Sequence, residues 1–200
     1  MPAVGRMTLA PMLNRRGKLI GDFTVARLAS DHFYIFGSGP AETYHMRWFQ
    51  AHLPASGVTI RPLGLELTGF SIAGPNSRDV LAALAGDDVS NEAFRFMAFR
   101  KLDLDRVPAL VGRISFTGDL GYEIWVKPDY QRLLLDLLLA AGIPARHPPV
   151  RQQGARLLAF REEFRRVGRA NTGRSTRRSK LGSIASSIST RASSSAAKPR

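Results

Sequence analysis

The stretch "RISFTGDLGYEIWV", Arg113–Val126, decides how the middle of the chain is interpreted. Apolar residues stand on both sides of a Thr-Gly-Asp-Leu-Gly segment, a pattern that predicts two strands joined by a turn. The second predicted strand, residues 120–126, carries one carboxylate, Glu123, among apolar neighbours. A charge is costly to bury unless a partner stabilises it, so Glu123 becomes the first candidate functional residue.

The residues on both sides of this stretch predict an alternation of strands and helices. "NRRG" has the composition of a hairpin tip, and residues 40–53 carry apolar side chains near helical spacing behind Pro40. Residues 129–141 predict a helix capped by Asp129 and ended by Gly142. The predicted elements are strands at 18–28, 31–36, 65–74, 95–104, 109–116 and 120–126, and helices at 40–53, 77–86 and 129–141.

These elements favour an α+β fold of antiparallel sheets with covering helices. The long regular βαβ spacing of a Rossmann sheet and a Gly-rich phosphate loop are both missing from the sequence. We expect a first domain at residues 1–142, followed by a basic, Ser/Arg-rich tail at 143–200. The Ser/Ala composition of the tail has no core-forming periodicity, so we expect it to be disordered and unpacked.

Charge separates the same two regions. Of the 29 Lys and Arg and 16 Asp and Glu residues, 1–146 hold 16 and 14, whereas 147–200 hold 13 and 2. The basicity of the whole chain therefore gives the first region no reason to bind nucleic acid. The chain has no cysteine, and its four histidines lack ligand spacing, so no metal site is expected. No membrane span or signal pattern is recognisable, and we expect a cytoplasmic location.

Four stretches together resemble the folate-binding aminomethyltransferase domain. That domain occurs in the glycine-cleavage T protein and at the carboxyl end of the flavin-linked dimethylglycine and sarcosine dehydrogenases, and the dehydrogenase branch is the more similar. The resemblance covers about residues 5–142, and its most specific part is the Thr-Gly-Asp-x-Gly-Tyr-Glu-Ile motif. The stretches are "MTLAPMLNRRGKLIGDFTVARL" (7–28), "DHFYIFGSG" (31–39), "LELTGFSIAGPNSRDVLAAL" (65–84) and "ISFTGDLGYEIWV" (114–126).

The resemblance implies roles for two neighbouring residues of that motif. The family's glutamate at the Glu123 position accepts hydrogen bonds from the pterin ring of tetrahydrofolate, whose amide edge and exocyclic amine offer two parallel donors. Tyr122 is implied beside the pterin, as a packing residue of the cofactor site. The alternative for Glu123 is an edge-strand glutamate that faces solvent.

Asp22 matches a carboxylate that the family keeps near the reactive folate nitrogens. The implied role is a general base that orients the cofactor and accepts a proton during one-carbon transfer. The alternative is a turn aspartate near a hairpin. We expect Asp119 only to shape its turn. Five further residues either line an apolar folate slot or simply pack in the core, and packing is the preferred interpretation: Met7, Met12, Leu13, Phe33 and Tyr34.

The resemblance also implies cofactors and partners. Tetrahydrofolate is the small-molecule partner, whereas the FAD of a dehydrogenase belongs to a flavin domain that this sequence lacks. A flavin domain or another protein is an implied partner, and neither a membrane nor a specific nucleic acid is expected. The chain is thus interpreted as a piece of an aminomethyltransferase-like or dimethylglycine dehydrogenase-like enzyme that is inactive alone.

The carboxyl-terminal region departs from the family pattern. Family codons taken out of frame can give residues 151–155 and 183–189, so we hypothesise a truncated chain that leaves its ancestral frame between Gly142 and Arg151. A natural basic tail is the alternative, and sequencing of the locus distinguishes the two. Two other functions stay open, a non-catalytic folate-binding module and a nucleic-acid binder that acts through the tail.

Overall fold

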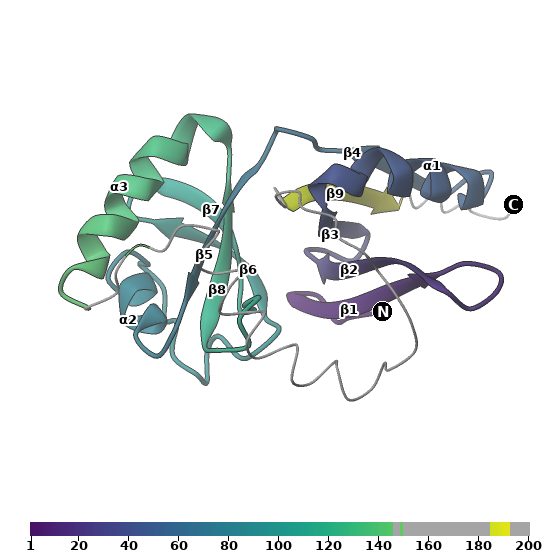
Figure 1. Cartoon of the computed structure of the whole chain (residues 1–200). Helices are drawn as coiled ribbons and strands as arrows, with labels where there is room; N and C mark the ends of the chain where they lie inside the picture. Colours follow the sequence, from purple (N-terminus) through teal and green to yellow (C-terminus); the bar gives the residue numbers. More distant parts are fainter. Residues whose placement is uncertain (146–148, 150–184, 193–200) are drawn as a thin grey trace, which may run out of the picture.

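Two antiparallel sheets make up most of the structure, a computed structural model that describes residues 1–145, 149 and 185–192 (Figure 1). The first sheet has the strand order β1-β2-β3-β9-β4 and the second has the order β5-β8-β7-β6. The strands of the first sheet are β1 (Arg6–Leu13), β2 (Leu19–Arg27), β3 (His32–Ser38), β4 (Val58–Pro62) and β9 (Ala185–Ala192). Those of the second are β5 (Thr68–Ala73), β6 (Phe99–Leu104), β7 (Val107–Gly112) and β8 (Gly121–Val126).

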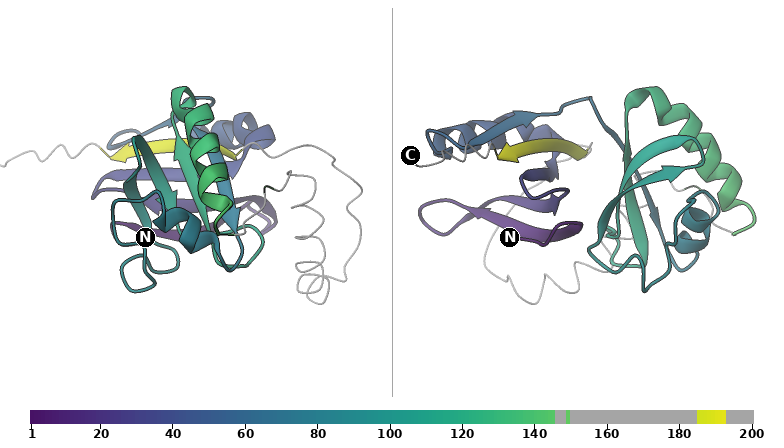
Figure 2. Two further views of the ribbon diagram at one scale, coloured as in Figure 1. Left: turned by 90° about the vertical axis from the view of Figure 1, so that its left-hand side faces the viewer. Right: turned by 180° about the vertical axis from the view of Figure 1, so that it is seen from behind.

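Helices cover the face of each sheet that is turned away from the other sheet (Figure 2). Helix α1 (Glu42–His52) follows the 3₁₀ turn η1 (Gly39–Ala41) and packs on the first sheet through the contacts of Phe23 with His45 and Phe49. Helices α2 (Ser77–Ala82) and α3 (Gln131–Gly142) cover the second sheet. None of the helices in the described part of the chain is long and apolar enough to cross a membrane.

The larger core lies between the second sheet and its helices. Because side chains alternate along a strand, Tyr122, Ile124 and Val126 of β8 all point toward α2 and α3. They pack there with Leu134 and Leu138 of α3. Fully burying an apolar side chain of this size stabilises the fold by roughly 1.5–3 kcal/mol, so this side of β8 serves stability.

A smaller core joins the two sheets. Phe36 of β3 and Trp125 of β8 stack with ring centroids 4.0 Å apart, and Phe99 packs edge-on against both rings. Met7 and Ala26 complete the contact from β1 and β2. We call the sides of the two sheets that meet here their inner faces, and the sides that carry helices their outer faces.

Most predicted elements are confirmed, with shifted ends. The antiparallel α+β architecture is confirmed, and α1, α3 and the strands of the second sheet lie within or beside their predicted ranges. The predicted cap of α3 is wrong, because Asp129 lies inside the 3₁₀ turn η2 (Pro128–Tyr130) and Tyr130 occupies the cap position without a side-chain hydrogen bond. Strands β1 and β4 were not predicted, and β4 is a short edge strand that ends in a proline.

The structure differs from the expected unpacked tail at one segment. Residues 185–192 form β9, which pairs with β3 on one side and β4 on the other. The backbone of a Ser/Ala-rich segment can fill a sheet position without any apolar side-chain pattern, so periodicity gave no signal for it. The basic helix predicted for 151–169 lies outside the described residues.

Candidate functional site

Glu123 lies on the inner face of the second sheet. It belongs to β8, which runs between β5 and β7, and its direct cross-strand neighbours are Ser71 and Gly112. Trp125, two residues further along, points to the same side and stacks on Phe36 of the first sheet. The solvent-facing edge strand considered as an alternative for Glu123 is therefore wrong, because β8 is a central strand and Glu123 is partly buried.

Small residues surround the Glu123 carboxylate. A Cβ atom added to Gly112 would lie 2.9 Å from Sδ of Met7 and 3.3 Å from Cζ3 of Trp125, so this position points into the inner face. Ser71 on the other neighbouring strand is exposed. On the Gly112 side, Met7 and Trp125 therefore pack over the glycine, whereas on the Ser71 side only a short, exposed hydroxymethyl group flanks Glu123.

Gly121 allows the turn before β8 to close onto β5. A Cβ atom at this position would lie 2.6 Å from Cβ of Ser115 and 2.7 Å from the carbonyl oxygen of Ile72. Real Cβ atoms do not approach other atoms so closely, so only glycine fits here. The glycine before Tyr-Glu in the motif therefore fixes the start of the strand that carries Glu123.

Burial raises the pKa of Glu123 to about 7. Within the part of the chain that the structure describes, no hydrogen bond or ion pair reaches this carboxyl group, so nothing offsets the loss of water around its charged form. A partly buried carboxylate without a hydrogen-bond donor lowers the stability of the folded chain, so its presence indicates a functional role. The geometry suits a ligand that brings two donors.

Asp22 lies on the inner face of the first sheet. It pairs with Pro11 of β1 and is exposed, while the intervening Phe23 points to α1 on the outer face. Thr24, on the same side as Asp22, pairs with Phe36, which stacks on Trp125. With a rise of about 3.3 Å per residue, Asp22 lies about 7 Å along its strand from Thr24, and Glu123 lies about 7 Å from Trp125. The two carboxylates thus lie on the inner faces of the two sheets, each two residues along its strand from a residue of the joining core or its direct neighbour.

The side chain of Tyr122 points to the opposite face of β8 from that of Glu123. It is fully buried on the outer face of β8, its ring centroid lies 5.7 Å from that of Phe94, and its hydroxyl oxygen accepts a hydrogen bond of 3.2 Å from Nε of Arg78. The structure therefore places this residue in the core. Asp119 shapes its turn, since its carbonyl oxygen accepts a hydrogen bond of 2.5 Å from Oγ of Ser115.

The five residues considered for an apolar slot divide between the two faces of the first sheet. Met7 and Tyr34 belong to the core between the sheets. Met12 and Phe33 point to the outer face, where Met12 lies beside Phe23, and Leu13 is exposed near the hairpin tip. Only Met7 and Tyr34 therefore face the second sheet. Core packing is the interpretation that the structure favours for both.

Sequence reasoning missed the two neighbours that define the space around Glu123. Ser71 and Gly112 lie about 50 and 10 residues away along the chain, and only the strand register brings them to Glu123. The one signal in the sequence is Gly112 at the end of an apolar strand, where a glycine often marks a close approach or a bend.

The family model described as the GCVT N-terminal domain matches residues 1–176. The chain belongs to the GCVT N-terminal domain family. The aminomethyltransferase resemblance is thereby confirmed. The match extends past Gly142, where the sequence predicted the end of the domain, and the boundary itself stays a prediction.

Relatives of this GCVT domain include three kinds of enzyme. The chain is 29% identical to human mitochondrial dimethylglycine dehydrogenase over 144 residues, which are 71% of this chain and 17% of that protein. It is 32% identical to sarcosine oxidase subunit alpha of Corynebacterium sp. (strain U-96) over 176 residues, 85% of this chain and 18% of that protein. The chain therefore spans less than a fifth of these relatives.

Aminomethyltransferases complete the comparison. The protein of Natranaerobius thermophilus is 27% identical over 139 residues, 69% of this chain and 37% of that protein. The crystal structure of glycine cleavage system aminomethyltransferase T from Bartonella henselae superimposes with a TM-score of 0.56 at 22% identity, over 72% of this chain and 37% of that one. At that identity the likeness concerns the fold alone.

Proposed function

We propose that this GCVT domain binds a reduced folate, tetrahydrofolate in the cell, between its two sheets at Glu123. The observation that carries the proposal is the partly buried Glu123 carboxyl group, which has a pKa raised to about 7 and no donor among the described residues. The amide edge and exocyclic amine of a pterin are two parallel donors at the spacing of a carboxylate. Such donors stabilise the ionised form of Glu123 and repay its desolvation.

The small neighbours of Glu123 fit the same ligand. A pterin is flat and needs a slot without side chains beside the carboxylate that holds it. Ser71 leaves the β5 side of Glu123 open, since it is short and exposed and β5 is an edge strand, whereas Met7 and Trp125 cover the Gly112 side. A ligand can therefore enter past β5 without opening the core between the sheets.

Asp22 is proposed as the general base. A bound tetrahydrofolate supplies a nucleophilic nitrogen that captures a one-carbon unit. Asp22 is an exposed carboxylate on the facing sheet, so it can accept the proton that the nitrogen loses without moving any core residue. Tyr122 has no proposed contact with the cofactor, because it lies on the outer face of β8.

We further propose that the chain is the folate-binding part of an enzyme of the dimethylglycine or sarcosine dehydrogenase type. The matched segment makes up less than a fifth of each relative with these names. We therefore assign oxidation of the amine on FAD to a flavin domain and not to this chain. We expect the chain alone to bind folate and to catalyse little or no one-carbon transfer.

Titration of the full chain with 5-formyltetrahydrofolate, a stable reduced folate, tests the proposal. Saturable binding that weakens at least tenfold in Glu123→Gln is expected, since glutamine keeps the shape and loses the charge. Glu92→Gln is the matched control, because Glu92 is an exposed glutamate between α2 and β6. Equal binding by wild type and Glu123→Gln would contradict the proposal.

A transfer assay separates catalysis from binding alone. If Asp22 is the base, the enzyme that contains this domain loses one-carbon transfer in Asp22→Asn while its folate affinity changes little. A non-catalytic folate-binding module would show no turnover of an aminomethyl donor in either form.

A further inference from the structure

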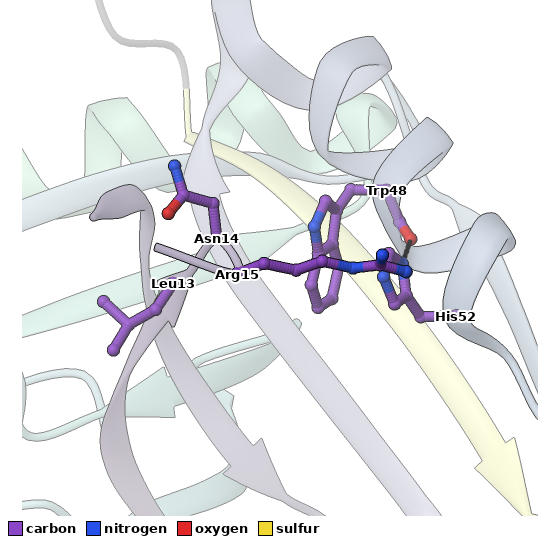
Figure 3. A pocket seen from close by; sticks show the side chains of 5 residues that line it. All are labelled: Leu13, Asn14, Arg15, Trp48 and His52. Carbon is purple, nitrogen blue, oxygen red and sulfur yellow. Dashed lines mark hydrogen bonds between the residues drawn. The ribbon is translucent and has the colours of Figure 1, made fainter. Parts of the chain in front are cut away.

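A cavity lies on the outer side of the first sheet, at the end away from the second sheet (Figures 1 and 3). It has a volume of about 470 Å³ and lies between the tip of the β1–β2 hairpin and the last turn of α1. Its lining residues are Leu13, Asn14, Arg15, Trp48 and His52. We call it the hairpin–helix groove. It shares no lining residue with the site around Glu123 and Asp22.

One wall of the groove is a preformed pair of aromatic rings. Trp48 and His52 are one helical turn apart, and their rings stack with centroids 4.0 Å apart and an angle of 16° between the planes. Nδ1 of His52 lies 2.7 Å from the carbonyl oxygen of Trp48. Because a carbonyl oxygen only accepts, Nδ1 donates in this bond, which holds the imidazole parallel to the indole (Figure 3). The stack needs no rearrangement to receive another flat ring.

The opposite wall supplies positive charge. Arg15 extends from the hairpin tip toward the two rings (Figure 3), and Arg16 and Lys18 belong to the same turn. The side-chain oxygen of Asn14 accepts hydrogen bonds of 2.9 and 3.0 Å from the backbone N–H groups of Arg16 and Lys18, which fixes the turn.

The positive charge of the hairpin tip is not neutralised within the part of the chain that the structure describes. None of its three cations takes part in an ion pair there, and no carboxylate lines the groove. Arg15 is thus free to pair with an anion brought by a ligand. A guanidinium offers a planar fork of donors that suits phosphate or carboxylate.

We propose that the hairpin–helix groove binds an aromatic anion, with its flat ring on the Trp48–His52 stack and its phosphate or carboxylate on Arg15. The volume lies within the range of about 300–1,000 Å³ that small-molecule sites occupy. A nucleoside monophosphate and an aromatic carboxylate such as p-aminobenzoylglutamate share this chemistry. The site is independent of the folate site proposed at Glu123.

Calorimetric titration of the full chain with two probes distinguishes these sources. AMP supplies a base and a phosphate, whereas p-aminobenzoylglutamate supplies a benzoyl ring and carboxylates. Ribose 5-phosphate and adenosine each carry one half of AMP and serve as controls. The variants are Arg15→Gln and Trp48→Leu, and Arg95→Gln is the matched control because Arg95 is an exposed arginine beside the second sheet.

Saturable binding of either whole probe is expected, weakened at least tenfold in Arg15→Gln and in Trp48→Leu and unchanged in Arg95→Gln. Binding of AMP alone assigns the groove to nucleotides, and binding of p-aminobenzoylglutamate alone assigns it to aromatic carboxylates. Tryptophan fluorescence gives a second readout in the wild type, since a stacked ring quenches Trp48 while Trp125 is only 2% exposed.

Three results would overturn the proposal. They are the absence of saturable binding by both whole probes, equal binding in wild type and Arg15→Gln, and binding of ribose 5-phosphate as tight as that of AMP. Arg15 lies in an exposed turn, so Arg15→Gln keeps the test decisive even if Trp48→Leu fails to fold.

Discussion

The two sides of strand β8 have different surroundings. On the outer side, Tyr122, Ile124 and Val126 are at most 1% exposed and pack under α2 and α3. On the inner side, Glu123 keeps a carboxyl group without a donor among the described residues, between a glycine and a serine. Alternate residues of one strand thus serve stability and binding. The comparison predicts that a substitution at Tyr122 lowers stability, whereas a substitution at the next residue, Glu123, lowers folate binding.

The largest expected effect belongs to the outer side. Tyr122→Ala removes a fully buried ring and leaves Arg78 without its hydroxyl partner. The free energy of unfolding should fall by roughly 3–5 kcal/mol, as for other large-to-alanine changes in a core. Urea denaturation measures this, with Tyr130→Ala at a partly buried position as the milder control. A loss below 1 kcal/mol would show that β8 does not carry the core.

On the inner side, removal of a side-chain charge should raise stability above neutral pH, whereas truncation on the outer side lowers it. The pKa of Glu123 is about 7 in the folded chain and about 4.3 in an unfolded one, so the unfolded state releases its proton first. The stability of the wild type should therefore fall as the pH rises from about 4.5 to 7 and level off above that. At about 1.36 kcal/mol per pKa unit, the difference of about 2.7 units gives a fall of at most roughly 3.7 kcal/mol.

The neutral variant Glu123→Gln isolates this contribution. It lacks the group that titrates, so its stability should change less between pH 5 and pH 8, and at pH 8 it should exceed the wild type. Thermal denaturation of both proteins across this pH range gives the comparison. Parallel curves for the two proteins would mean that Glu123 is not the group responsible.

A smaller effect is expected at Gly112. An added methyl group would meet Met7 at 2.9 Å and displace its side chain beside Glu123. Because the end of the methionine side chain is flexible, Gly112→Ala should cost about 1–2 kcal/mol of stability, near the lower end of overpacking effects. Reduced-folate affinity should fall more steeply than stability does. Unchanged affinity in a folded variant would remove Gly112 from the site.

The smallest effect is expected at Glu66. Its exposed ion pair with Arg61 lowers the pKa of the Glu66 carboxyl, mainly through their hydrogen bond. Exposed pairs contribute little because water screens them. Glu66→Gln should leave both the melting temperature and folate affinity close to the wild-type values. A large loss of affinity would place the ligand in a different part of the molecule.

The sequence was sufficient for most of the elements but not for which strands become neighbours. Alternation of apolar residues and the turn glycines located β8 and singled out Glu123, because both signals are local. The outward direction of Tyr122 also follows from alternation, although the motif resemblance had placed it beside the cofactor. Strand pairing is not local, so the positions of Ser71 and Gly112 beside Glu123 depend on a register that no short stretch encodes.

Two other differences between the predicted and the observed elements also have physical causes. Asp129 has a good capping side chain, but Pro128 starts a 3₁₀ turn that moves the helix start beyond it. Strand β9 joins the first sheet through its backbone, and backbone pairing leaves no pattern in a Ser/Ala-rich sequence. The hairpin–helix groove combines two distant segments, so neither Trp48 nor Arg15 drew attention by itself.

Proton release on folate binding tests the central claim most directly. At pH 6 the free Glu123 is mostly protonated, because its pKa is about 7. Pterin donors favour the ionised form, so binding of 5-formyltetrahydrofolate should release close to one proton per site from the wild type and none from Glu123→Gln. Calorimetry in buffers of different ionisation enthalpy measures this number. Binding without proton release, or with equal release in both proteins, would contradict the assignment of Glu123 as the folate-binding carboxylate.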